Sequence, residues 1–201
     1  MKNTIKLLLC CLCFIVLTNC KNKEKETADY GAVSASVEEL SLEDSIKRGN
    51  YLVNIMDCNV CHSPKIMSDQ GPIIDESRML SGHPADAQLP EINPNEITPD
   101  KWVMTTQDLT VWVGLWGVSF TANLTSDETG IGTWSLDQFK RAIRQGKFKG
   151  MENGRTLLPP MPWQTYSYLT DEDVKAIYDY LKSIPPIRNI VPAPIPPTEI
   201  Q

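Results

Sequence analysis

Five consecutive residues, Cys58-Asn59-Val60-Cys61-His62, constrain this chain more than any other feature. Two thiols three positions apart, followed at once by an imidazole, form the pattern of covalent c-type haem attachment. The spacing suits this chemistry because two thioether bonds fix the macrocycle to a short turn, while His62 faces the iron as its proximal ligand. The sequence therefore predicts one covalently bound haem c, held by Cys58, Cys61 and His62.

Two other uses of these thiols are a disulfide, with a thioredoxin-like redox site as its functional form, and a zinc knuckle. A thioredoxin-like site requires a strand–helix–strand pattern, which the surrounding sequence does not show. A zinc knuckle requires four ligands, and after Cys58, Cys61 and His62 only His83 is left as a usual fourth ligand. Both alternatives fit the sequence less well than a haem.

The first 19 residues have the features of an export signal. A basic start precedes an apolar run over residues 7–17, which is too short to span a bilayer stably. The run ends at Leu17-Thr18-Asn19-Cys20, which resembles the lipobox of bacterial lipoproteins, with Asn19 in place of the usual small residue. We expect a signal peptide over residues 1–19 and a lipid on Cys20, with an uncleaved signal anchor as the alternative. Either form exports the protein and tethers it to a bacterial membrane, facing the periplasm or the cell exterior.

The charge balance of the chain is acidic. The net charge is −6, and it becomes −8 if Lys2 and Lys6 leave with the signal peptide. This balance argues against a nucleic-acid partner and favours a basic or locally complementary protein. Residues 20–40 are polar and charged, which indicates a flexible tether between the lipid and one folded domain over residues 41–190.

The first half of this domain is predicted to contain one long helix and then irregular structure. Ser41 can cap a helix that delivers its C-terminal end to Cys58. Gly49 falls on the buried face, which indicates that another helix crosses very close to it. Residues 63–101 show no sustained period and predict a long loop lying over the haem. The apolar, aromatic stretch 102–120 predicts a short extended pair or a loop that shields one haem edge.

Two further helices are predicted nearer the C-terminus. Ser135 begins the first, with Gln138 placed for a capping box and Gly146 placed for a C-terminal cap. Thr170 caps the last helix, which has an apolar face at helical spacing and stops at Pro185.

The first of these helices and the residues after it are rich in cations. These cations are Lys140, Arg141, Arg144, Lys147 and Lys149. Their default role is a solvated helix face, and the alternatives are a docking patch and a binding site for haem propionates. Arg144 and Arg155 are the candidate propionate partners. The Pro-rich tail, residues 191–201, is expected to be extended, and it either wraps the domain or binds a partner.

The segment Pro159-Pro160-Met161-Pro162-Trp163 places a methionine between prolines, where helix propensity cannot explain it. A stiff extended strap holds a thioether in one place at little further entropic cost. Met161 is therefore the candidate sixth ligand of the iron, and a Met/His pair raises the haem potential. The alternatives are a buried methionine that fills a gap and ligation by His83, whose ordinary role would be a surface or hydrogen-bonded residue.

Together these segments resemble a class I cytochrome c. The resemblance rests on Arg48-Gly49-Asn50-Tyr51-Leu52 before the haem pentapeptide, on the Pro-Met-Pro strap and on the Tyr- and Leu-bearing last helix. More narrowly, Asn123-Leu124-Thr125, residues 128–135 and the strap are similar to the cytochrome c modules that serve membrane-bound alcohol, sugar and gluconate dehydrogenases. The resemblance covers roughly residues 43–192. It implies an all-α cytochrome c fold, with long irregular loops wrapped around one covalent haem.

The resemblance implies a membrane-tethered monohaem cytochrome c that passes single electrons to redox partners and is not itself an enzyme. The partners would be a dehydrogenase, an oxidase or a respiratory complex. The related subunits commonly carry three haem modules, whereas this sequence has a single Cys-x-x-Cys-His and no internal repeat. The alternatives are a dedicated haem subunit of a dehydrogenase or oxidase complex, and a ligand-binding or peroxide-handling haem protein with a displaceable sixth ligand.

Overall fold

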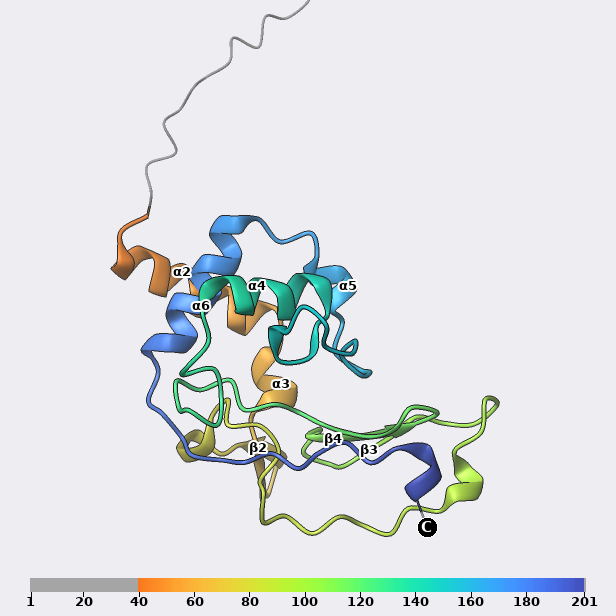
Figure 1. The fold of residues 1–201 in the computed structure, drawn as a ribbon. Coiled ribbons are helices and arrows are strands. Elements are labelled where there is room, and N and C mark those ends of the chain that lie inside the picture. Colours follow the sequence, from red (N-terminus) through yellow and green to blue (C-terminus); the bar gives the residue numbers. More distant parts are fainter. Residues whose placement is uncertain (1–39, 201) are drawn as a thin grey trace, which may run out of the picture. The chain divides into compact units, whose positions relative to one another are not determined.

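Residues 40–200 are the part of the chain that the computed structural model describes, and in them the helices and the strands occupy different regions (Figure 1). The predictions of a signal peptide and of lipidation at Cys20 lie outside these residues. The helices are α2 (Leu42–Ile55), α3 (Cys58–His62), α4 (Leu136–Gln145), α5 (Trp163–Tyr166) and α6 (Asp171–Ser183). The strands are β1 (Lys65–Ser68), β2 (Gly71–Ile74), β3 (Met104–Thr105), β4 (Val111–Gly114) and β5 (Gly117–Phe120). Within residues 40–200, no helix is long and apolar enough to cross a membrane.

Helices α2 and α6 cross at Gly49, as the sequence predicted. The Ser41 hydroxyl caps α2 by accepting a hydrogen bond from the Asp44 backbone N–H at 3.1 Å. A Cβ atom at position 49 would overlap the backbone carbonyl of Ala176, so only glycine allows this separation of the two helices. The crossing buries apolar residues of both helices in one core: Leu52, Val53, Val174, Ala176, Ile177 and Leu181.

Helix α4 begins and ends where the sequence predicted. Ser135 accepts a hydrogen bond from the Gln138 backbone N–H at 3.2 Å, and Gly146 ends the helix in the left-handed conformation with φ 62°. The Gln138 side chain does not return to Ser135, however, and donates to the Lys149 carbonyl at 2.9 Å. The capping-box prediction is therefore only half right, because the bond from Nε2 to Lys149 turns the Gln138 amide toward the following turn (Phe148–Gly150).

Two small antiparallel sheets correct the all-α prediction. Strands β1 and β2 form a hairpin inside the expected loop 63–101, with Ile66 paired to Ile73. Strands β3, β4 and β5 form a three-stranded sheet, which confirms the extended structure predicted for residues 102–120. Buried valines of β4 and β5 give this sheet its own apolar cluster, separate from the helical core: Val111, Val113 and Val118. The described domain is thus a helical core with two small sheets.

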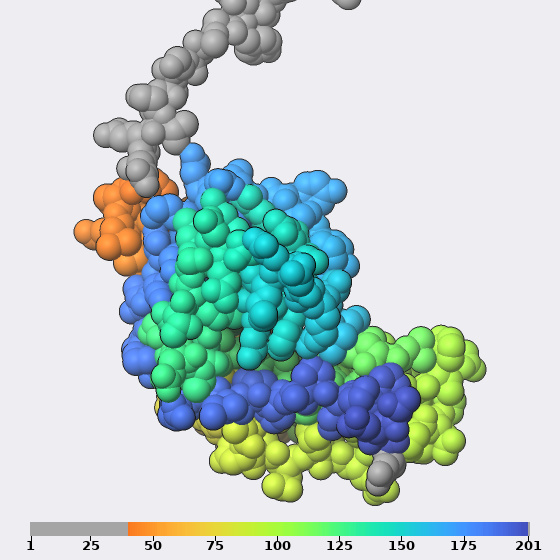
Figure 2. Space-filling model, viewed as in Figure 1, coloured from red at the N-terminus to blue at the C-terminus, as the bar shows by residue number. Residues whose placement is uncertain are grey.

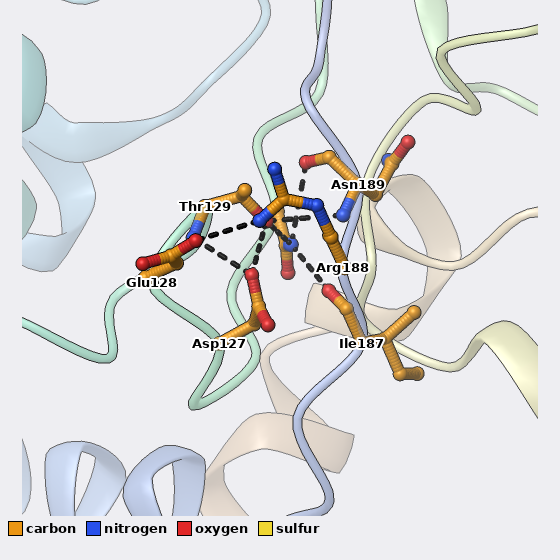
Figure 3. A network of polar contacts seen from close by, with 7 residues as sticks. Asp127, Glu128, Thr129, Ile187, Arg188 and Asn189 are labelled. Atoms are coloured by element: carbon orange, nitrogen blue, oxygen red, sulfur yellow. Dashed lines mark hydrogen bonds and ion pairs between the residues drawn. The ribbon is translucent and has the colours of Figure 1, made fainter.

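The segment after α6 wraps the domain, which is one of the two roles considered for the tail (Figure 2). Val118 and Ile195 exchange two backbone hydrogen bonds, at 2.8 and 3.0 Å, so the tail adds an isolated β-bridge to β5. Closer to α6, the Asn189 backbone N–H donates to the Thr129 hydroxyl, and the Arg188 guanidinium donates to the Glu128 carboxylate (Figure 3). Thr129 and Glu128 lie in the loop between β5 and α4. The tail therefore runs from the helical core to the three-stranded sheet.

Candidate haem-attachment site

Helix α3 is a single turn that brings the three residues of the attachment motif to one face. Asp57, with φ 57°, separates α3 from α2. Cys58, Cys61 and His62 then stand at positions i, i+3 and i+4, which share one side of a helix. Cys58 and Met56 also pack against the helical core. The geometry fits the attachment of one planar group along that face.

The two thiols are free and half-buried. Burial raises the pKa of Cys58 to about 11, and burial also raises the pKa of Cys61. Redox-active thiols have a lowered pKa instead, so the surroundings of this pair do not support a thioredoxin-like role. Within residues 40–200, no group of three or more His, Cys, Asp or Glu side chains is placed to hold a metal ion.

The His62 imidazole is oriented by a backbone carbonyl. Its Nδ1 lies 2.8 Å from the oxygen of Ala122, and because a carbonyl can only accept, Nδ1 carries the proton. Nε2 is then left with its lone pair, which is the arrangement of a metal-ligating histidine. Desolvation by burial lowers the pKa of His62, although the bond to Ala122 works in the opposite direction. The neutral, ligand-competent imidazole is therefore favoured.

The turn that carries the motif is held by polar contacts from the following loop. The Ser63 hydroxyl donates to the Asn59 side chain at 2.9 Å and accepts from the Leu80 backbone N–H at 2.9 Å. The Gly82 N–H donates to the carbonyl of His62 at 2.8 Å. Sequence patterns gave no sign of these bonds, because serine and glycine are ordinary loop residues.

The strap that carries Met161 is fixed on both sides of the methionine. Before it, the Ser119 hydroxyl donates to the Pro159 carbonyl at 2.6 Å. After it, the Tyr166 hydroxyl donates at 3.1 Å to the carbonyl of Met56, two residues before Cys58. Burial raises the pKa of Tyr166 to about 12, helped by the negative charge that Cys58 and then Cys61 would carry as thiolates. The C-terminal side of the strap therefore lies near the attachment motif.

One stretch of chain contacts both segments that carry the predicted axial ligands. Ser119 in β5 holds Pro159 of the strap, and Ala122 holds the imidazole of His62. Two residues separate Ser119 from Ala122, so the three steps between them span at most about 11 Å of extended chain. The structure thus brings the Met161 strap and the histidine-bearing turn to the same strand and its continuation.

His83 is buried, with 3% of its surface exposed, and hydrogen-bonded. Its Nδ1 lies 2.8 Å from the hydroxyl of Thr110, and that hydroxyl donates its one proton to Asp108 at 2.8 Å. Nδ1 of His83 is therefore the donor in this pair. The Phe120 ring lies 5.1 Å from the imidazole, and desolvation by burial lowers the pKa of His83. This is the hydrogen-bonded role weighed for His83, in a buried position rather than on the surface.

The cations of α4 are largely engaged inside the domain. Lys140 and Arg144 both donate to the carboxylate of Asp171 at the start of α6, at 2.9 and 2.5 Å. Arg141 donates to a backbone carbonyl of the turn after α4 at 2.7 Å. Arg155 lies over an aromatic ring, 4.0 Å from its centroid. These contacts join α4 to α6 and to the following turn.

Comparison with known proteins gives relatives that match only part of their length, and no family model matches the chain. The chain is 34% identical over 136 residues to the gluconate 2-dehydrogenase cytochrome c subunit of Pantoea cypripedii, covering 67% of this chain and 22% of that protein. It is 31% identical over 157 residues to the fructose dehydrogenase cytochrome subunit of Gluconobacter japonicus, covering 78% and 24%. The cytochrome c subunit of the quinone alcohol dehydrogenase of Gluconobacter oxydans is 28% identical over 152 residues, covering 75% and 23%. The chain therefore spans less than a quarter of these relatives, and what it is similar to is one part of the cytochrome c subunits of dehydrogenases.

Proposed function

We propose that this protein is a monohaem c-type cytochrome that transfers single electrons. Cys58 and Cys61 would hold the haem through thioether bonds, His62 would ligate the iron through Nε2, and Met161 would supply the sixth ligand. A bound haem supplies a one-electron Fe(III)/Fe(II) couple. The protein supplies attachment, burial and the two axial side chains.

The observation that carries this proposal is the arrangement of α3. Cys58, Cys61 and His62 share one helical face, and Nδ1 of His62 is already bonded to the Ala122 carbonyl. That bond fixes the ring and leaves Nε2 available, as a proximal ligand requires. The surroundings of the two thiols do not favour the thiolates that a redox-active pair would need.

The role we propose is electron transfer without catalysis. With His62 and Met161 both on the iron, neither oxygen nor a small substrate could bind there directly. The similarity to cytochrome subunits of dehydrogenases supports a dehydrogenase as the electron donor. The chain would serve either as a haem subunit of such a complex or as a carrier that receives its electrons.

We also propose that Cys20 carries a lipid and that the haem domain works on the exported side of a bacterial membrane. The support is the sequence alone, in the basic start, the short apolar run and the cysteine that follows it. A tether of this kind keeps the carrier near its partners and raises its effective concentration without new contacts.

The sixth ligand is the part of the proposal to test first. The ferric holoprotein should show the weak near-infrared charge-transfer band of sulfur-to-iron ligation, and Met161→Ala should abolish it. Met151→Ala is the matched control, because Met151 is 59% exposed and follows the turn after α4. The control should keep the band.

The opposite result would change the assigned function. If the wild-type protein has covalent haem but lacks the band, Met161 is not on the iron. Rapid binding of cyanide or carbon monoxide to that protein would then favour the ligand-binding alternative, with an open or displaceable sixth position.

A further inference from the structure

Ser119 is a buried serine whose hydroxyl faces the strap. It is 7% exposed, and its Oγ lies 2.6 Å from the Pro159 carbonyl and 3.4 Å from the Trp112 carbonyl. A hydroxyl has one proton to donate, so the shorter contact takes it. The Trp116 indole N–H donates to the same Oγ at 3.2 Å, which fills an acceptor position and orients the hydroxyl. The hydrogen bonds therefore run in one direction, from Trp116 to Ser119 and from Ser119 to Pro159 of the strap.

We propose that Ser119 is a positioning residue for the sixth ligand, which holds the strap so that Met161 reaches the iron. This inference rests on the proposed function. Pro159 lies two residues before Met161, and the proline rings at positions 159, 160 and 162 limit backbone rotation around the methionine. Fixing the Pro159 carbonyl consequently limits where the thioether can go.

The same stretch of chain also fixes the proximal side. Ser119 lies in β5, and two residues after this strand ends the carbonyl of Ala122 holds Nδ1 of His62. β5 pairs with β4 along one edge, and the C-terminal tail restrains the other edge of β5 through the bridge between Val118 and Ile195. β5 and the residues directly after it therefore set the positions of both axial segments. This gives the three-stranded sheet a function that the predicted all-α fold did not include.

The physical reason to expect an effect is that a thioether is a weak ligand, which must be kept in place by the surrounding backbone. Without the Ser119 hydroxyl, the Pro159 carbonyl and the Trp116 N–H lose a partner in a half-buried region. The strap should then leave the iron more readily. An added ligand that competes with Met161 should bind more tightly.

The experiment measures the affinity of imidazole for the ferric iron, with the near-infrared band and the reduction potential as further readouts. Ser119→Ala should increase imidazole affinity by about 2- to 10-fold, the range that corresponds to one hydrogen bond. Its band should weaken and its potential should fall. Ser126→Ala is the matched control, because Ser126 makes a similar bond to the Ile184 carbonyl at 2.7 Å, outside the strap. The control should leave all three readouts unchanged.

A double-variant comparison separates positioning from general loosening. If Ser119 acts through Met161, adding Ser119→Ala to Met161→Ala should not change imidazole affinity further. An equal effect in both backgrounds overturns the proposal. Should Ser119→Ala fail to fold, Trp116→Phe removes the bond that orients the hydroxyl. It should raise imidazole affinity by a smaller factor, and no change in that variant also overturns the proposal.

The failure of this inference is distinct from the failure of the proposed function. A wild-type protein without the near-infrared band rules out Met161 as the ligand, whatever Ser119 does. A wild-type protein with the band, and a Ser119→Ala variant that matches Ser126→Ala, leaves Met161 on the iron and overturns only the role of Ser119.

Discussion

Gly49 sets how closely α2 and α6 approach, and its substitution tests the crossing directly. Gly49→Ala places a methyl group on the backbone carbonyl of Ala176, which cannot rotate away as a flexible side chain would. The better helix propensity of alanine returns about 1 kcal/mol, but overpacking costs about 1–3 kcal/mol and backbone overlap falls at the severe end of that range. We expect the free energy of unfolding, measured with denaturant, to fall by about 2 kcal/mol.

The control is Lys47→Ala on the same helix, whose side chain is 68% exposed and pairs with Glu43. A surface pair of this kind contributes about 0–1 kcal/mol, so this variant should stay close to the wild type. An unchanged or increased stability of Gly49→Ala would show that the helices cross at a larger separation.

Single residues with a chemical signature could be predicted from the sequence, and their partners could not. Ser41 and Thr170 act as helix caps, as predicted, because capping depends on one side chain and a local N–H. The carbonyl of Ala122 and the hydroxyl of Ser119 have no such signature. Any residue offers a carbonyl, and the pairing of Ser119 with Pro159 depends on chain segments forty residues apart.

Helices α4 and α6 are joined at the level of elements by the Asp171 carboxylate, and this junction predicts a pH dependence. Hydrogen bonds from Lys140 and then Arg144 lower the pKa of Asp171 below its ordinary value of 3.8. A lowered pKa contributes stability above pH 3.8, and this contribution is lost as the pH falls through the folded-state value. Asp171→Asn should therefore be slightly less stable than the wild type near neutral pH, with a difference that shrinks below pH 3.8.

The effect should be small and sensitive to salt, because the Asp171 side chain is 70% exposed. Denaturant unfolding at several pH values and two salt concentrations measures it. Glu172→Gln is the control, since Glu172 shares the first turn of α6 and forms no ion pair within the described residues. A stability difference for Asp171→Asn that persists at acidic pH would contradict the assignment.

The elements themselves were predictable where they were long enough for an apolar pattern to repeat. α2, α4 and α6 span 14, 10 and 13 residues, enough for an apolar stripe to repeat. The strands β1 and β2 have four residues each, and a run of that length carries almost no period. Ile66 and Ile73 are exposed, so the hairpin has no alternating buried face that its sequence could reveal. The surrounding segment, rich in proline and polar residues, predicted a loop instead.

At the scale of the whole molecule, the segment after α6 is joined to the rest of the described domain by contacts that sequence patterns could not reveal. The tail was predicted to be extended, which is right as far as Pro196 but not for the 3-10 turn Pro197–Glu199, and its proline content says nothing about where the tail lies. Buried Asn189 decides this, because its amide group donates to the carbonyls of Ser81 and His83 at 2.7 and 2.8 Å. Its oxygen accepts from the Ala85 N–H at 3.0 Å. A single residue thus joins the segment after α6 to the loop that follows the candidate haem-attachment turn.

Asn189→Ala should consequently loosen this loop as well as the tail. Three backbone groups lose their partner in a buried region, and an unsatisfied buried group costs about 1–3 kcal/mol. We expect the free energy of unfolding to fall by about 2–4 kcal/mol, since water entering the gap would satisfy part of the loss. Amide hydrogen exchange should become faster at Gly82, whose N–H bonds the carbonyl of His62, and at Val118 in the β-bridge to the tail.

The neighbouring residue separates burial from charge. Arg188 pairs with Glu128 at 2.6 Å, but the two side chains are 64% and 69% exposed (Figure 3). Arg188→Ala should therefore change stability by less than about 1 kcal/mol and leave exchange at Gly82 and Val118 as it is. If Arg188→Ala proves as destabilising as Asn189→Ala, the exposed ion pair holds the tail and the buried amide does not. If Asn189→Ala speeds exchange only within the tail, the loop after α3 is held by its own contacts to α3. The segment after α6 then has no part in fixing the His62 side of the candidate haem site.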